Sequence, residues 1–166
     1  MMQLNVKIVP VEAVNDSLAQ MVALFRVELR SYKGIVSKPN IDAGRQELEE
    51  YLAAGFPVFA AVVNGAYAGY VVCRIDSEVV WVESIFVREE YRRLGVASVL
   101  HSKAEELALS YGEETVYNYV HPNNHRMIDF LRKRGYTVLN LIEIRKPYKG
   151  EQLPQKICVG EHEFDY

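Results

Sequence analysis

Apolar residues recur at helical spacing in two segments of the first third of the chain, from Leu18 to Tyr32 and from Ile41 to Leu52. Either Asn15 or Asp16 is placed to cap the first helix, and Gly55 is placed to end the second. The loop-like segment between the two helices, residues 34–38, could border a binding site. The pattern therefore predicts a helical pair near the N-terminus.

Strand-like runs surround and follow this pair. Asn64-Gly65 separates two of them and is the strongest short signal for a β-hairpin, and Asp76-Ser77 makes a second turn. The runs are Leu4 to Val11, Pro57 to Val63, Ala66 to Ile75 and Val79 to Val87. The last three predict consecutive antiparallel strands.

The second half alternates helices and strands. Val96 to Tyr111 reads as a helix that closes at Gly112, and a second helix runs from about Asn124 to Arg134 with Gly135 as its stop. Expected strands are Thr115 to Val120, Tyr136 to Ile144 and a short one at Lys156 to Val159. Without repeats or linkers, this order predicts one α/β domain with a mixed sheet.

Composition narrows the class of protein. The 166 residues are 49% hydrophobic and 25% charged, as in an ordinary soluble domain. A net charge of −3 argues against nucleic acid as the main partner. No apolar run could cross a membrane, and Met1 to Asn5 does not begin a signal peptide. Cys73 and Cys158 lack metal-ligand spacing, which leaves two reduced thiols and predicts a cytoplasmic protein without a metal.

The most informative stretch joins the strand Val80 to Val87, through a polar turn, to a helix that opens at Arg92 to Ala97. The first N–H groups of a helix are unpaired and lie at its positive end, so they can bind an anion. Gly95 would let a ligand approach the backbone closely, and the small Ala97 keeps the helix start open. A phosphate or pyrophosphate is the expected ligand at this helix start.

These residues resemble the GNAT superfamily of acyl-CoA N-acyltransferases. Its signature Arg/Gln-x-x-Gly-x-Gly/Ala matches Arg92 to Ala97, and Asn124, Gly135 and Tyr136 match a second family element that follows the fifth strand. The order of elements agrees over residues 4–145. The resemblance implies a single domain over residues 1–166, of α/β (α+β) class, with a mixed, mostly antiparallel central sheet flanked by helices.

The resemblance also implies acetyl-CoA as the co-substrate and a primary amine, on a small molecule or a protein, as the acceptor that attacks the thioester directly. The pantetheine arm would pair with the backbone of the fourth strand, which is implied to splay from the fifth strand. The implied acetyl-CoA contacts are Ile85, Phe86, Val87, Arg92, Arg93, Leu94, Gly95, Val96, Ala97, Ser98 and Asn124.

The resemblance does not supply the catalytic acid, because Leu131 stands where the family usually has a general-acid tyrosine. Glu83 is the candidate base: it is the one charge inside its strand, on a predicted face with Trp81, Ile85 and Val87, although a structural salt bridge to an arginine would also explain it. Tyr119 and His121, which share a predicted strand face with Tyr117, could hold a water chain or act as acid. Aromatic residues also simply suit strands.

Two other functions compete with a transferase. A non-catalytic acyl-CoA sensor is kept open by Leu131, whereas Glu83 favours catalysis. Another phosphate-binding α/β protein is disfavoured, because a doubly wound fold would alternate strands and helices from the start. The sequence leaves the acceptor and the oligomeric state open, with a homodimer as the commonest soluble assembly.

Overall fold

The structure is a computed structural model that describes residues 4–166, so the first three residues of the segment inspected for a signal peptide lie outside it. By its internal contacts the chain divides into two compact units, Met1–Tyr119 and Val120–Tyr166. The single domain expected over residues 1–166 stays a prediction.

The first unit is built on a five-stranded sheet in the order β1-β2-β3-β4-β5. Strands β1 to β4 are antiparallel to their neighbours, and β5 is parallel to β4. The strands are Val6–Pro10, Val58–Val63, Ala66–Asp76, Val79–Val87 and Tyr117–Asn118. This mixed, mostly antiparallel sheet with flanking helices confirms the expected fold class.

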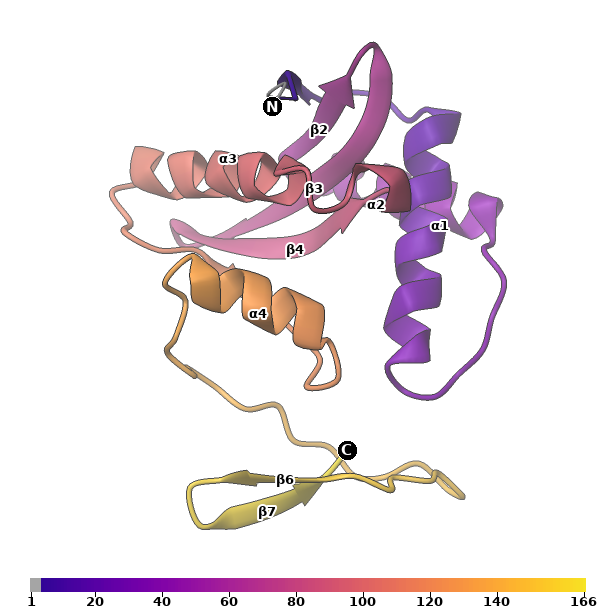
Figure 1. Ribbon diagram of the computed structural model, residues 1–166, viewed down its shortest axis with the longest axis vertical. Helices are drawn as coiled ribbons and strands as arrows, with labels where there is room; N and C mark the ends of the chain where they lie inside the picture. Colours follow the sequence, from indigo (N-terminus) through magenta and orange to yellow (C-terminus); the bar gives the residue numbers. More distant parts are fainter. Residues whose placement is uncertain (1–3) are drawn as a thin grey trace. The chain divides into compact units, whose positions relative to one another are not determined.

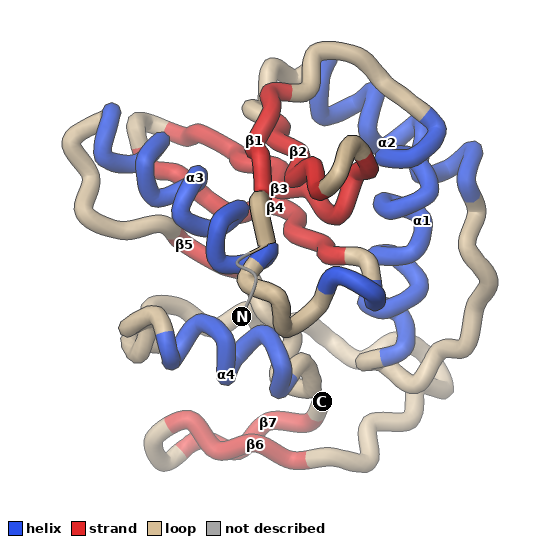
Figure 2. The backbone as a smooth tube through the Cα atoms, turned by 45° about the horizontal axis from the view of Figure 1, so that its top comes forward, coloured by secondary structure: helices blue, strands red, loops and turns tan. Residues whose placement is uncertain are grey.

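Helices cover both faces of the sheet. Figure 1 and Figure 2 show the strands between α3 (Val96–Ser110) and the pair α1 (Asp16–Ser31) and α2 (Ile41–Ala53). We call the two sides the α3 face and the α1–α2 face. The apolar stripe of α1 packs on β2, β3 and β4 in a cluster whose buried members are Leu18, Met21, Val22, Leu48, Tyr51, Val58, Ala60, Tyr70, Val72 and Phe86.

Local signals in the sequence account for the ends of these elements. The side chain of Asn15 accepts a hydrogen bond from the Leu18 N–H, 2.9 Å away, and caps α1. Asn40 caps α2 in the same way. Asn64 and Gly65 both have positive φ, at 49° and 81°, which is the geometry that a two-residue hairpin needs. The predicted hairpin between β2 and β3 is confirmed.

A bulge in β4 changes which residues share a face. Ser84 pairs with Val72 whereas Val82 pairs with Cys73, so Glu83 is an extra residue without a partner on β3. Ser84 bonds to Tyr70 and Phe86 belongs to the α1 cluster, which places both on the α1–α2 face. The predicted common face of Glu83 with Ile85 and Val87 is therefore wrong, because the bulge interrupts the alternation that such a prediction assumes.

The fifth strand is shorter than the expected Thr115 to Val120, since its ladder with β4 holds only at Tyr117 and Asn118. In the second unit, α4 (His125–Lys133) forms as expected, and β6 (Lys156–Val159) forms a hairpin with β7 (His162–Asp165). The expected strand from Tyr136 to Ile144 is wrong. That segment forms no ladder, because alternation of apolar residues does not by itself supply a partner strand.

No helix within residues 4–166 has the length and apolar character that crossing a membrane requires.

Candidate functional site

The start of α3 is shaped to receive an anion. Its first helical hydrogen bond runs from the Val99 N–H to the Gly95 carbonyl at 3.1 Å, so the N–H groups of Val96, Ala97 and Ser98 precede the ladder. Among the α-helices of residues 4–166, α3 alone has no side-chain cap, and its first turn carries no acidic residue. The positive end of the helix dipole is thus left uncompensated.

The backbone before this helix is held in an uncommon conformation. Gly95 has φ of 85°, a left-handed value that glycine adopts without a steric penalty, and Arg93 has φ of 62°. A Cβ on Gly95 would meet no atom within 4 Å, so the space in front of the residue is open. Arg93 and Leu94 are exposed beside it.

Arg92 makes structural contacts that the sequence analysis did not predict. Its Nε donates to the Val87 carbonyl at 2.8 Å, its terminal nitrogen forms an ion pair with Glu28 of α1, and its guanidinium lies 5.3 Å from the centre of the Phe86 ring. The side chain therefore joins the end of β4 to α1. A contact between Arg92 and a pyrophosphate stays a prediction. The Arg92 side chain already makes the three contacts given above.

The C-terminal half of β4 has a bare edge. The ladder with β5 ends at Val82 and Asn118, so from Glu83 to Val87 this side of β4 has no strand partner among residues 4–119. Backbone groups along such an edge can pair with an extended ligand. Ile85, Phe86 and Val87 line this edge, although the Phe86 side chain itself is buried against α1.

Glu83 lies at the bulge, beside this edge. Its Oε2 is 3.2 Å from Nε of Arg74, and its side chain is 31% exposed. The salt bridge that the sequence left as an alternative is therefore present. A partly exposed carboxylate at a strand bulge also remains within reach of solvent and of a ligand, so the structural and chemical roles are compatible.

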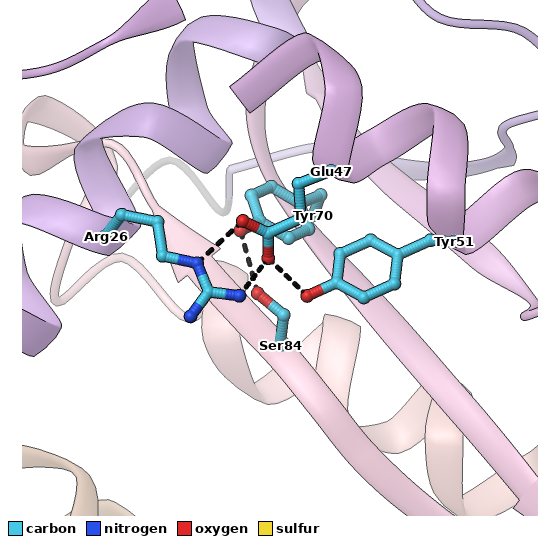
Figure 3. Close-up of polar contacts among 5 residues, drawn as sticks. All are labelled: Arg26, Glu47, Tyr51, Tyr70 and Ser84. Carbon is cyan, nitrogen blue, oxygen red and sulfur yellow. Dashed lines mark hydrogen bonds and ion pairs between the residues drawn. The ribbon is translucent and has the colours of Figure 1, made fainter. Parts of the chain in front are cut away.

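A polar cluster lies close to the bulge on the α1–α2 face (Figure 3). Glu47 of α2 accepts hydrogen bonds from Nε of Arg26, at 2.6 Å, and from the Tyr51 hydroxyl. Next to them, the Tyr70 and Ser84 hydroxyls lie 2.8 Å apart and are buried. Figure 3 shows all five side chains converging from α1, α2, β3 and β4.

Burial and charge shift the titration of this cluster. Burial, reinforced by the hydrogen bond to Glu47 and by the charges of Glu47 and Glu83, raises the pKa of Tyr51. Burial also raises the pKa of Tyr70. The hydrogen bond to Glu47 raises the pKa of Arg26. The cluster therefore keeps neutral tyrosines and a charged arginine at neutral pH.

Three aromatic rings gather on the same α1–α2 face, around Trp81, two residues before Glu83 on β4. The Trp81 ring centre lies 4.8 Å from that of Tyr117 and 4.8 Å from that of Tyr119, which is stacked on it with an interplanar angle of 13°. The Arg74 guanidinium lies 5.2 Å from the Trp81 ring centre. Tyr117 and Tyr119 thus share a face, as expected, and that face carries Trp81.

The remaining sequence-predicted residues belong to the second unit. His121 lies in the turn before α4, where its Nδ1 accepts from the Asn123 N–H at 3.1 Å. Asn124 caps α4 through a bond from the Met127 N–H, as the sequence suggests. Leu131 is buried in α4. Their roles toward acetyl-CoA and in proton transfer stay predictions.

Sequence reasoning missed most of the polar cluster and its neighbour Arg74. Glu47 and Tyr51 are four residues apart, so they share a helix face. A carboxylate beside the apolar stripe of α2 was therefore the sequence signal that could have indicated this part of the cluster. No comparable signal pointed to Tyr70 or Ser84, because their pairing depends on the register of β3 with β4. Within residues 4–166, no group of three or more His, Cys, Asp and Glu side chains could hold a metal ion.

Comparison with known proteins gives two curated relatives, each 30% identical to this chain. The N-alpha-acetyltransferase of Sulfurisphaera tokodaii aligns with 58% of this chain and 64% of that protein. The tyramine N-feruloyltransferase 4/11 of Nicotiana tabacum aligns over 94 residues, 57% of this chain and 38% of that protein. The chain thus spans less than two thirds of each relative.

Among solved structures, the aminoglycoside N-acetyltransferase AAC(6')-Iy in complex with CoA is similar in fold, with a TM-score of 0.64 and 23% identity over 86% of this chain and 95% of that one. The model of the acetyltransferase (GNAT) family matches residues 21–136, which include the α3 start and the bulge of β4. This chain belongs to the acetyltransferase (GNAT) family.

Proposed function

We propose that this protein is an acetyl-CoA-dependent N-acetyltransferase that moves the acetyl group to a primary amine by direct attack on the thioester. The observation that carries the proposal is the arrangement along β4: a partly exposed carboxylate at the bulge, a bare strand edge, and then an uncapped helix start. The two unpaired cysteines fit the reducing cytoplasm.

The co-substrate fits the described residues in two places. Its pyrophosphate would accept hydrogen bonds from the N–H groups of Val96, Ala97 and Ser98, which precede the α3 ladder, and Gly95 leaves the approach open. Its pantetheine arm would lie along the bare edge of β4, pairing with the backbone of Ile85 and Val87. The solved relative that was crystallised with CoA supports the same choice of ligand.

The transfer itself needs an uncharged amine. At pH 7 only about one lysine-like amine in a few thousand is neutral. The nitrogen lone pair attacks the thioester carbonyl carbon, the C–N bond forms, and the C–S bond breaks with its electron pair leaving on sulfur. The products are an amide and free CoA thiol, once the nitrogen has lost a proton and the sulfur has gained one.

We assign the base to Glu83, which takes the proton from nitrogen directly or through water. Tyr119, which is 62% exposed beside Trp81, and His121 are the candidates for returning a proton or for holding the water chain. With Leu131 in place of the usual tyrosine, the thiolate leaves with less help. Its reference pKa near 8.5 makes it an adequate leaving group.

The proposal is tested by mixing the protein with acetyl-CoA and a panel of primary amines. Free thiol and the amide product are measured, the latter by mass spectrometry. The panel includes tyramine and an aminoglycoside, because relatives of this chain carry those words in their names. Thiol and amide formed together support the transferase. Tight acetyl-CoA binding with no product from any amine overturns it in favour of an acyl-CoA sensor.

A further inference from the structure

The aromatic group on the α1–α2 face has an arrangement that the transfer chemistry does not require. Trp81 is covered by Tyr119 and Tyr117, while Tyr119 itself is 62% exposed. A stacked pair whose outer ring faces solvent offers a flat apolar surface for another ring. We call Trp81, Tyr117 and Tyr119 the aromatic platform.

The platform adjoins the candidate base. Arg74 links the two, since its guanidinium lies over Trp81 at 5.2 Å while its Nε contacts Glu83 at 3.2 Å. Trp81 and Glu83 are two residues apart on β4, which corresponds to about 7 Å along a strand. A ligand of modest length could therefore place a ring on the platform and an amine at Glu83.

The charges near the bulge argue against a polycationic acceptor. Glu47 is paired with Arg26, Glu83 with Arg74, and the more distant Glu28 with Arg92. Each of these three carboxylates is already matched by one cation, so together they offer little net negative charge to a polyamine or an aminosugar. A ligand with a single amine and an apolar body is the better electrostatic match.

From the platform and these paired charges, we propose that the acceptor is an arylalkyl monoamine whose ring stacks on Tyr119 and whose amine lies at Glu83. This inference rests on the proposed function, because it names the acceptor substrate of the proposed transferase site. Arg74 then is a positioning residue: it orients the Trp81 ring and the Glu83 carboxylate together.

Trp81 is the one tryptophan in the sequence, so its fluorescence reports on the platform without any need for turnover. The protein is titrated with 2-phenylethylamine, and the Trp81 emission is followed. The controls are 2-cyclohexylethylamine, which has the same length and charge without aromaticity, 3-phenylpropionate, which replaces the amine with a carboxylate, and spermidine.

We expect 2-phenylethylamine to change the emission saturably and to bind about three- to tenfold more tightly than its cyclohexyl analogue. Tyr119→Leu should remove that difference, whereas Tyr119→Phe keeps the ring and should preserve it. Tyr111→Leu, at an exposed tyrosine just after α3, is the matched control and should leave binding unchanged. Calorimetric titration of each variant checks the affinities independently of fluorescence.

Equal binding of the phenyl and cyclohexyl amines, tighter binding of spermidine, or an unaffected Tyr119→Leu variant would overturn the inference. The two proposals fail separately. Saturable, ring-dependent binding without acetyl transfer leaves the platform standing and removes the transferase, while acetyl transfer to amines that do not perturb Trp81 does the reverse.

Discussion

Arg74 and Glu83 form an ion pair across a break in the sheet: Nε of Arg74 on β3 lies 3.2 Å from Oε2 of Glu83, which has no cross-strand partner on β3. At the bulge the Glu83 carboxylate contacts Arg74, whose guanidinium lies over the Trp81 ring. A salt bridge with both side chains about one third exposed contributes little to stability, so the pair is better explained by orientation than by folding energy.

The first prediction concerns this carboxylate. Glu83→Gln keeps the shape and removes the basicity, so kcat/KM for acetyl transfer should fall by about 100-fold or more. The affinity for acetyl-CoA, measured by calorimetry, should stay within about twofold, because the proposed cofactor contacts are farther along β4 and on α3. Glu106→Gln, on the exposed side of α3, serves as the control and should match the wild type. Wild-type activity in Glu83→Gln would leave the residue with a structural role.

The second prediction places the pyrophosphate. Asparagine tolerates the left-handed conformation that Gly95 adopts. Gly95→Asn should therefore keep the backbone and add a side chain in front of the α3 N–H groups. Helix-end interactions are worth up to about 2 kcal/mol, so acetyl-CoA binding should weaken by about tenfold or more. Gly55→Asn is the matched control, since Gly55 also has positive φ and open space. Equal affinity in the two folded variants would refute the placement.

The third prediction concerns the buried hydroxyl pair. Tyr70→Phe leaves the Ser84 hydroxyl buried without its partner 2.8 Å away, which should lower the free energy of unfolding by about 1–3 kcal/mol. The double variant Tyr70→Phe/Ser84→Ala should cost less than the sum of the single changes, because no orphaned group remains. Urea denaturation measures all three variants. Strict additivity would mean that the two hydroxyls do not depend on each other.

The fourth prediction tests the contact between α1 and α2. A Cβ on Gly44 would lie 2.3 Å from the Ala19 carbonyl oxygen and 2.9 Å from the Ala23 nitrogen, both backbone atoms. Alanine favours a helix by about 1 kcal/mol over glycine, yet here Gly44→Ala should destabilise the protein by about 1–3 kcal/mol, since the helices must move apart. Glu49→Ala, exposed on the same helix, should stay near zero in the same denaturation series.

The fifth prediction uses the two thiols. Burial raises the pKa of Cys73 to about 12, while Cys158 is exposed. At pH 8 about one Cys73 in ten thousand is thiolate, so a thiol reagent should label one cysteine quickly and the second only in denaturant. Because burial favours the neutral thiol, the stabilising contribution of Cys73 is complete below the unfolded-state pKa near 8.5 and declines as the pH rises toward 12. Rapid labelling of both thiols in the folded protein would contradict the burial.

Short-range signals in the sequence determined the elements whose physics is local. Asn15 and Asn40 supply side-chain acceptors to the helix starts that follow them, and Asn64-Gly65 adopts the positive φ values that its hairpin needs. These effects depend on residues within a few positions, so they could be predicted without knowledge of the fold. The same holds for Gly95 at the start of α3.

Tertiary structure decided the features that need a partner from elsewhere in the chain. The bulge at Glu83 exists only in the register of β4 against β3, and it alone separates Glu83 from the face of Ile85 and Val87. The run from Tyr136 to Ile144 has a strand-like pattern but no ladder. Arg92 matches the family signature by itself, yet Glu28, a residue of α1, determines where its charge lies. Pairing across the sheet and between charges depends on distance in space, which local sequence patterns do not encode.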